Sequence, residues 1–251
     1  AVLGDPMAVE FVSTTGQTRF TALASGEIDI LARNTTWTFS RDNDLKFEFI
    51  GVNYYDGQGF MIPKELGVSS AKELDGATVC IQTGTTTELN LADFFRKNNI
   101  SYEPVPIETN AEGQQQYLAG ACDTYTTDAS GLAATRATFE NPTEHVILPE
   151  IISKEPLGPL VRHGDQEWGD IVRWTLNALI AAEEFGITSA NVEELAANGT
   201  DKPEVNRILG VEGTLGEMLG LEADWAVKAI AAGGNYGELF EKHIGEKTPV
   251  G

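Results

Sequence analysis

Residues 75–100 read DGATVCIQTGTTTELNLADFFRKNNI, and this stretch decides the fold class. Its run TVCIQ at 78–82 is short, apolar and partly β-branched, which is typical of a buried strand. A glycine and three threonines follow it and lead into a stretch with helical spacing, whose apolar face contains Leu89, Ala92 and Phe95. A strand, a glycine turn and a helix in this order indicate one β/α unit.

The same alternation extends on both sides of this unit. The expected strands are 8–12, 28–33, the alternating stretch Leu45–Phe49, 101–107 and 122–127, and the expected helices are Arg19–Ala24 ending at Gly26, 111–119 and one from Asp128. From about Asp165 the pattern is almost entirely helical, first with Ile171, Trp174, Ala178, Ala182 and Phe185 on one face, then at 190–197, 203–209 and 223–232. The sequence therefore predicts two successive α/β units and a helical C-terminal region, with crossings at Gly51–Pro63 and Pro156–Leu160.

Length and charge restrict the class of protein. A chain of 251 residues forms one large domain or two lobes. A net charge of −21 repels phosphate backbones and anionic lipid, so nucleic acid is not an expected partner. No apolar run approaches the roughly 20 residues that span a bilayer. The two cysteines and three histidines lack metal-ligand spacing, so no metal is expected.

Polar residues gather at three strand ends. In the stretch 28–42, Asn34, Thr36 and Arg41 offer amide, hydroxyl and guanidinium donors to an anion. The alternative is a capped helix start with Arg41 in a surface ion pair. In the turn after 78–82, Gly84, Thr86 and Thr87 would present backbone N–H groups at a helix N-terminus, whereas the alternative is an ordinary capping box closed by Glu88.

The third strand end carries an acid, Asp128. Its alternatives are a helix N-cap and an anionic partner for a ligand ammonium. Two anion-binding strand ends, an arginine and an acid would together hold a zwitterion. A free α-amino acid is such a ligand.

Four segments carry a family resemblance over nearly the whole chain: IDILARNTTWTFSRD (28–42), 75–100, CDTYTTDASGLAATRA (122–137) and VRWTLNALIAAEEFGIT (172–188). They closely resemble the periplasmic amino-acid-binding proteins of ABC importers, in particular the general L-amino-acid-binding branch. The resemblance implies a type II periplasmic binding protein: two open β/α lobes joined by two hinge strands, closing over one L-amino acid. It assigns 1–60 and 160–251 to the first lobe and 61–159 to the second.

The resemblance also implies roles and partners. Asn34, Thr36 and Arg41, with Thr86 and Thr87 from the glycine turn at Gly84, would contact the ligand carboxylate, and Asp128 would hold its ammonium. The partners would be a free L-amino acid and the permease and ATPase of an ABC importer. We expect a monomeric, exported, periplasmic protein that is not an enzyme and carries no cofactor. Relative to the family, the chain is expected to lack a first strand and helix, a C-terminal end and a signal peptide.

Four further expectations concern two alternative functions, the two cysteines and the hinge. An enzyme alternative remains, because the same fold hosts periplasmic dehydratases, for which only Glu88 or Asp128 stands at a suitable strand end. A receptor's sensing module is a weaker alternative, since it calls for a membrane span or a fused domain.

Cys80 and Cys122 lie on strands expected to be neighbours, so they form either a disulfide, which an oxidising compartment would preserve, or two buried thiols. Residues 59–64 and 157–161 are the expected hinge strands.

Overall fold

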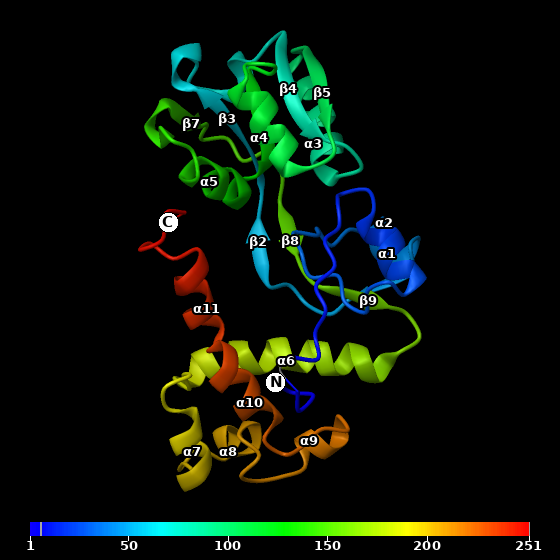
Figure 1. Cartoon of the computed structure of the whole chain (residues 1–251), viewed down its shortest axis with the longest axis vertical. Helices are drawn as coiled ribbons and strands as arrows, with labels where there is room; N and C mark the ends of the chain where they lie inside the picture. The colour runs from blue at the N-terminus through cyan, green and yellow to red at the C-terminus, as the bar shows by residue number, and fades with distance from the viewer. Residues whose placement is uncertain (6, 251) are drawn as a thin grey trace. The chain divides into compact units, whose positions relative to one another are not determined.

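The computed structural model describes residues 1–5 and 7–250, and it divides into two compact units. One unit is built on Ser13–Arg162 and contains all the sheets. The other comprises Ala1–Val12 and His163–Thr248 and is helical from Gln166 onward. Figure 1 shows the main sheet with its helices as the cyan and green part of the chain.

The main sheet has five strands in the order β5-β4-β6-β3-β7. They are β5 (Tyr102–Ile107), β4 (Ala77–Gln82), β6 (Thr124–Asp128), β3 (Gln58–Pro63) and β7 (His145–Ile147). β4 runs parallel to β5 and β6, as the β/α alternation predicted, whereas β3 runs antiparallel to both β6 and β7. The carboxyl ends of β4 and β6 and the start of β3 therefore meet at one edge of the sheet.

Helices cover both faces of this sheet. Successive residues of β3 and β4 alternate between two hydrophobic clusters, because side chains along a strand point to opposite faces. α3 (Thr86–Asn98) covers one face, while α4 (Asn110–Leu118) and α5 (Ala129–Ala137) supply Tyr117 and Leu132 to the other. The predicted face of α3 is wrong at Leu89, which is 69% exposed. The buried residues of α3 are Thr87, Leu91 and Phe95, which recur every four residues and begin in the first turn of the helix.

The segment before the sheet is less regular than the sequence predicted. α1 (Arg19–Ser25) ends at Gly26 as expected, and α2 (Phe39–Asn43) follows. Residues 8–12 form no strand, and 28–33 contribute only a bridge between Leu31 and Leu160. Phe11 is 93% exposed, so no apolar face holds residues 8–12 against a partner strand.

Two antiparallel ladders connect this segment to the sheet. β1 (Phe47–Phe49) pairs with β9 (Leu160–Arg162), and β2 (Tyr54–Asp56) pairs with β8 (Glu155–Leu157). The chain thus crosses twice: at β2, inside the predicted crossing Gly51–Pro63, and at β8, which begins one residue before the predicted crossing Pro156–Leu160 and overlaps it. The prediction of 59–64 as a hinge strand is wrong, because β3 is hydrogen-bonded to strands on both edges.

The helical unit confirms the pattern read from the C-terminal sequence. Its helices are α6 (Gln166–Phe185), α7 (Val192–Asn198), α8 (Pro203–Ile208), α9 (Leu215–Met218), α10 (Trp225–Gly233) and α11 (Tyr236–His243). Ala178 and Ala182 of α6 are buried as expected, but Trp174 is 51% exposed and does not belong to the core-facing stripe. Short 3-10 turns at Lys64–Leu66, Ala71–Glu73 and Pro142–Glu144 complete the described elements.

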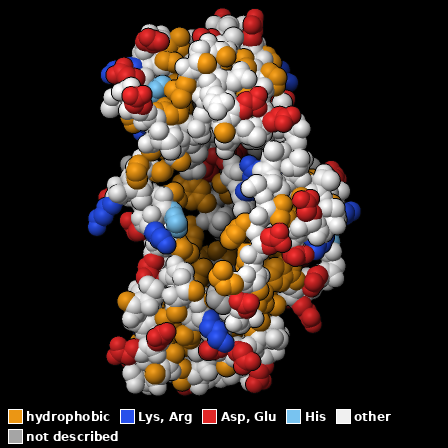
Figure 2. Space-filling model, viewed as in Figure 1, with side chains coloured by type: hydrophobic (Ala, Val, Ile, Leu, Met, Phe, Trp, Pro, Cys, Tyr) orange, Lys and Arg blue, Asp and Glu red, His pale blue; other side chains and the backbone are white. Residues whose placement is uncertain are grey.

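Surface charge is dispersed. Figure 2 shows acidic side chains scattered over the visible face, which agrees with the net charge of −21. Within the described residues, no helix combines the length and the apolar character needed to span a bilayer.

A disulfide joins Cys80 of β4 to Cys122, two residues before β6, with the Cα atoms 5.6 Å apart. Both residues are almost completely buried. The bond links two neighbouring parallel strands across the face covered by α4 and α5.

Replacing both cysteines by alanine should lower the free energy of unfolding by about 3–4 kcal/mol, because the bond closes a loop of 42 residues in the unfolded chain. Urea unfolding of the double variant beside the wild type measures this difference. Adding a reductant should reproduce the loss in the wild type and leave the double variant unchanged. A loss below about 1 kcal/mol would contradict the expected role of the bond.

Candidate functional site

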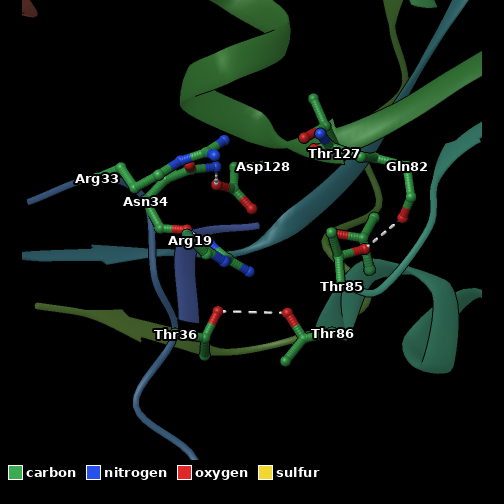
Figure 3. A pocket seen from close by; sticks show the side chains of 10 residues that line it. Arg19, Arg33, Asn34, Thr36, Gln82, Thr85, Thr86, Thr127 and Asp128 are labelled. Atoms are coloured by element: carbon green, nitrogen blue, oxygen red, sulfur yellow. Dashed lines mark hydrogen bonds between the residues drawn. The ribbon is translucent and has the colours of Figure 1, made fainter. Parts of the chain in front are cut away.

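A small polar cavity lies where β4 and β6 end. The residues around it come from α1, the 33–36 segment, the turn after β4 and the end of β6; they are Arg19, Arg33, Asn34, Thr36, Gln82, Thr85, Thr86, Thr87, Thr127 and Asp128. Figure 3 shows these side chains converging from both sides. The cavity volume is about 10 Å³, which is room for about one water molecule.

One wall is the threonine turn, residues 83–87, between β4 and α3. Gly84 adopts a left-handed φ of 71°, and Thr85 caps α3 by accepting a hydrogen bond from the Glu88 N–H at 3.4 Å. The Thr85 hydroxyl also donates to the carbonyl of Gln82 at 2.7 Å. Thr86 and Thr87, the first two residues of α3, line the cavity, so the partially positive N-terminus of this helix borders it.

The opposite wall is the 33–36 segment, which the chain holds against β8. The Trp37 N–H donates to the Pro156 carbonyl, and the Gly158 N–H donates to the Thr35 carbonyl. Two hydrogen bonds span the cavity: Asn34 Nδ2 to Asp128 Oδ2 at 2.6 Å, and Thr36 Oγ1 to Thr86 Oγ1 at 3.3 Å (Figure 3). The two walls are therefore in contact.

Three arginines lie at or beside this cavity. Arg19 is 3% exposed and donates from Nη1 to the Asn34 carbonyl and Thr35 Oγ1, while its buried Nε has no hydrogen-bond partner. Burial, with the nearby charges of Arg41 and Arg33, lowers the pKa of Arg19 to about 9. Arg33 donates to the Thr14 carbonyl, and Arg41 donates to the Thr36 carbonyl. The site therefore brings together two buried arginines, Arg19 and Arg41, and the partly buried Arg33.

Asp128 ends β6 at the N-cap position of α5, yet its side chain makes no capping hydrogen bond. The carboxyl group turns instead toward Asn34 in the cavity. Burial, the nearby side chain of Glu155 and the charge of Asp56 together raise the pKa of Asp128 to about 8, against the lowering effect of the Asn34 hydrogen bond. The helix-cap alternative for this residue is thus not what the structure shows.

Five of the seven expected ligand residues line the cavity: Asn34, Thr36, Thr86, Thr87 and Asp128. Gly84 shapes the turn from behind. Arg41 lies next to the cavity, with its guanidinium carbon 5.1 Å from the ring centre of Phe20. Their roles toward a ligand stay predictions.

Sequence reasoning did not assign Arg19, Arg33, Gln82, Thr85 or Thr127 to the site. Nothing in the sequence pattern indicates that Arg19 lines the cavity, beyond its position in an amphipathic helix. Among residues 1–5 and 7–250, no group of three or more His, Cys, Asp or Glu side chains is placed to hold a metal ion.

Comparisons with known proteins agree with this architecture. The family model of bacterial extracellular solute-binding proteins, family 3, matches residues 2–190. The chain is 67% identical over 251 residues, covering all of it and 74% of the relative, to the glutamate/glutamine/aspartate/asparagine-binding protein BztA of Rhodobacter capsulatus. It is 58% identical over 252 residues, covering all of it and 73% of the relative, to the general L-amino acid-binding periplasmic protein AapJ of Rhizobium johnstonii.

A solved structure shows the same fold. The ABC transporter periplasmic binding protein from Brucella ovis, with glutathione bound, superimposes with a TM-score of 0.94 at 54% identity. The match covers 99% of this chain and 78% of the other. These relatives are described as binding proteins, so they lend no support to the dehydratase alternative.

The threonine turn offers a matched test of the cavity's local order. Thr85→Ala and Thr109→Ala each remove a hydroxyl that accepts the N3 N–H of a helix, α3 and α4 respectively. Each should lower the free energy of unfolding by about 1 kcal/mol. Only Thr85→Ala should speed hydrogen exchange at the first turn of α3. Equal exchange there in both variants would show that Thr85 does not order the cavity wall.

Proposed function

Because the chain belongs to the bacterial extracellular solute-binding proteins of family 3, we propose that it captures a free L-amino acid in the cavity between Asp128 and the threonine turn and delivers it to an ABC importer. The fold is that of a type II periplasmic binding protein, with two lobes and two crossing strands. One observation carries the proposal: Asp128 turns its buried carboxyl group away from its own helix and toward a cavity whose other wall is a helix N-terminus.

The carboxylate of the amino acid would lie against the threonine turn. Thr86, Thr87 and Thr36 supply hydroxyl groups there, and the first turn of α3 supplies backbone N–H groups. Arg41, which already donates to the Thr36 carbonyl, is the proposed charged partner. The buried, unpartnered Nε of Arg19 is a further donor on this side.

The ammonium would lie against Asp128. Asp128 is 5% exposed, so an ammonium that binds it would leave water for a charged acceptor in a desolvated position. The Asn34 amide, which now donates to Asp128, is close enough to contact the same ligand through its carbonyl oxygen. Opposite charges at the two ends of the cavity suit a zwitterion better than a simple anion.

The ligand side chain is less constrained. The relatives' names include acidic amino acids, their amides and L-amino acids in general. Arg19 and Arg33 line the cavity and would suit carboxylate or amide side chains. We therefore propose glutamate, glutamine, aspartate and asparagine as the first ligands to test.

Ligand access requires motion, because the cavity admits only about one water molecule. The Asn34–Asp128 and Thr36–Thr86 contacts must separate, and β2 and β8 are the proposed hinge between lobes at 1–60 with 160–251 and at 61–159. The proposed setting is the periplasm, where the closed form would meet the importer's permease and ATPase subunits as a monomer.

Variants at the two poles test the ligand's orientation by calorimetric titration. Arg41→Ala should weaken binding of amino acids by on the order of 3 to 5 kcal/mol, because it leaves a buried carboxylate unpaired. Asp128→Asn should be comparably damaging for amino acids and much milder for the matching deaminated acids, which have no ammonium.

The control for these variants is Arg96→Ala, which removes an exposed arginine paired with Asp93 on α3. Its affinity should equal that of the wild type. If Arg41→Ala binds within about threefold of the wild type, the carboxylate is placed wrongly.

Closure predicts a change of shape on binding. Saturating amino acid should lower the radius of gyration measured by X-ray scattering, because ligand contacts on both walls stabilise the closed lobes. Asp128→Asn at the same amino-acid concentration should show a smaller change. Superimposable curves for the wild type with and without ligand would exclude a hinge closure.

A further inference from the structure

The N-terminus of α5 finds its hydrogen-bond acceptors in another part of the chain. Asp128, at the N-cap position, makes no side-chain cap. The Ala129 N–H donates instead to the Gly57 carbonyl at 2.8 Å. The Ser130 N–H donates to Asp56 Oδ1 at 3.4 Å, and the Ser130 hydroxyl donates to Asp56 Oδ2. Asp56 therefore does for α5 what the N-cap residue does for most helices.

Strand register places Asp56 opposite the first turn of α5. β3 and β6 pair antiparallel with Gln58 opposite Asp128, so the two residues before Gln58 run alongside the two residues after Asp128. Asp56 is the last residue of β2, the first crossing strand. Its Oδ1 also accepts the Gly57 N–H at 2.8 Å, which holds the carboxylate at the joint between β2 and β3.

Gly57 brings this joint close to the segment before β8. A Cβ atom at Gly57 would lie 2.3 Å from Ile151 Cγ2 and 2.7 Å from the Ser153 carbonyl oxygen, so a larger residue would displace that segment. The joint that carries Asp56 is therefore packed between α5 and the approach to the second crossing strand.

The helices that follow β4 and β5 are capped from within, in contrast to α5. Thr85 accepts the N3 N–H of α3, and Thr109 accepts that of α4. Asp128 has the same position in α5, and its backbone, at φ −52° and ψ 137°, leaves a cap within reach of a side-chain rotation. Its carboxyl group instead accepts from Asn34 at 2.6 Å (Figure 3). This orientation leaves the first turn of α5 with an acceptor because a second acid, Asp56, serves it.

We propose that Asp56 is a positioning residue for the ammonium of the ligand: by capping α5 from β2, it keeps the carboxyl group of Asp128 turned into the cavity. The inference rests on the proposed function, in which Asp128 binds that ammonium. Asp56 does not line the cavity, so it acts through Asp128. Without Asp56, the carboxylate of Asp128 would be the adjacent acceptor for the unpaired N–H groups of α5. Capping them would turn it away from Asn34.

Three variants separate this role from charge and from general stability. Asp56→Ala removes the cap. Asp56→Asn keeps the cap without the charge, because its amide oxygen can accept from the Ser130 N–H while its NH₂ donates to the Ser130 hydroxyl. The matched control is Glu150→Ala, which removes an acid that accepts from the Ser70 hydroxyl and the Ala71 N–H at the start of a 3-10 turn, away from the cavity lining.

The Asn34 side-chain amide reports the orientation of Asp128 in the protein without ligand. Its nitrogen–proton NMR signal, assigned with Asn34→Ala, should shift in Asp56→Ala because the hydrogen bond to Asp128 is lost. Ser130→Ala, a milder change, should shift the signal in the same direction. Asp56→Asn and Glu150→Ala should keep the wild-type signal. An unchanged signal in both Asp56→Ala and Ser130→Ala, or an equal shift in Asp56→Asn or Glu150→Ala, would overturn the proposal.

Calorimetric titration with glutamine measures the consequence for binding. Asp56→Ala should weaken binding by about tenfold or more, whereas Asp56→Asn and Glu150→Ala should stay within about threefold of the wild type. In an Asp128→Asn background, Asp56→Ala should cause no further loss, because the group that it positions is gone. An undiminished further loss there, or wild-type affinity in Asp56→Ala, would overturn the positioning role.

The two measurements also separate this proposal from the proposed function. Failure of glutamine, glutamate and the other first ligands to bind the wild type would overturn the proposed function. The Asn34 signal needs no ligand, so it would still decide whether Asp56 orients Asp128.

Discussion

The hydrogen bond between Asn34 and Asp128 is the interaction on which the site depends. It joins the segment held against β8 to the end of β6, two parts of the chain 94 residues apart. Asp128 makes this bond and does not cap α5. The first N–H groups of α5 must therefore bind other acceptors. The carboxyl group of Asp128 is therefore directed into the cavity, where it is available to a ligand.

The second constraint is the satisfaction of buried polar groups behind the cavity. Gln58 is fully buried at the start of β3, and its amide donates to the Thr87 carbonyl and to Thr126 Oγ1. Its backbone N–H donates to Ser153 Oγ, which donates in turn to Glu155. Sheet, threonine turn and crossing strand are thus joined by one network. Because an unpaired polar group is costly in this environment, movement of one member affects the others.

The parallel strands β4, β5 and β6, their helices and most of the polar strand ends could be predicted from sequence because they depend on local periodicity and turn chemistry. The antiparallel strands β3 and β7 could not, since 51–63 was expected to be a crossing and no strand was expected at 145–147. The face of α3 was misjudged at Leu89 because the helix phase is set by its cap at Thr85. Residues 8–12 look like a strand, but strand formation needs a partner edge that periodicity cannot reveal. Arg19 and Glu155 could not be assigned at all, since their roles arise from contacts with residues distant in sequence.

The chain as a whole is strongly negative, whereas the cavity is surrounded by positively charged arginines. Only 17 Lys and Arg residues offset 38 Asp and Glu residues overall, yet Arg19, Arg33 and Arg41 gather around one cavity. Such a local concentration of buried cations is costly unless acids compensate it, and Asp128, Glu155 and Asp56 stand beside it. The same acids would repel one another if all were ionised. A mixed cluster of this kind places both signs of charge side by side in a desolvated position, which suits the zwitterionic ligand proposed above.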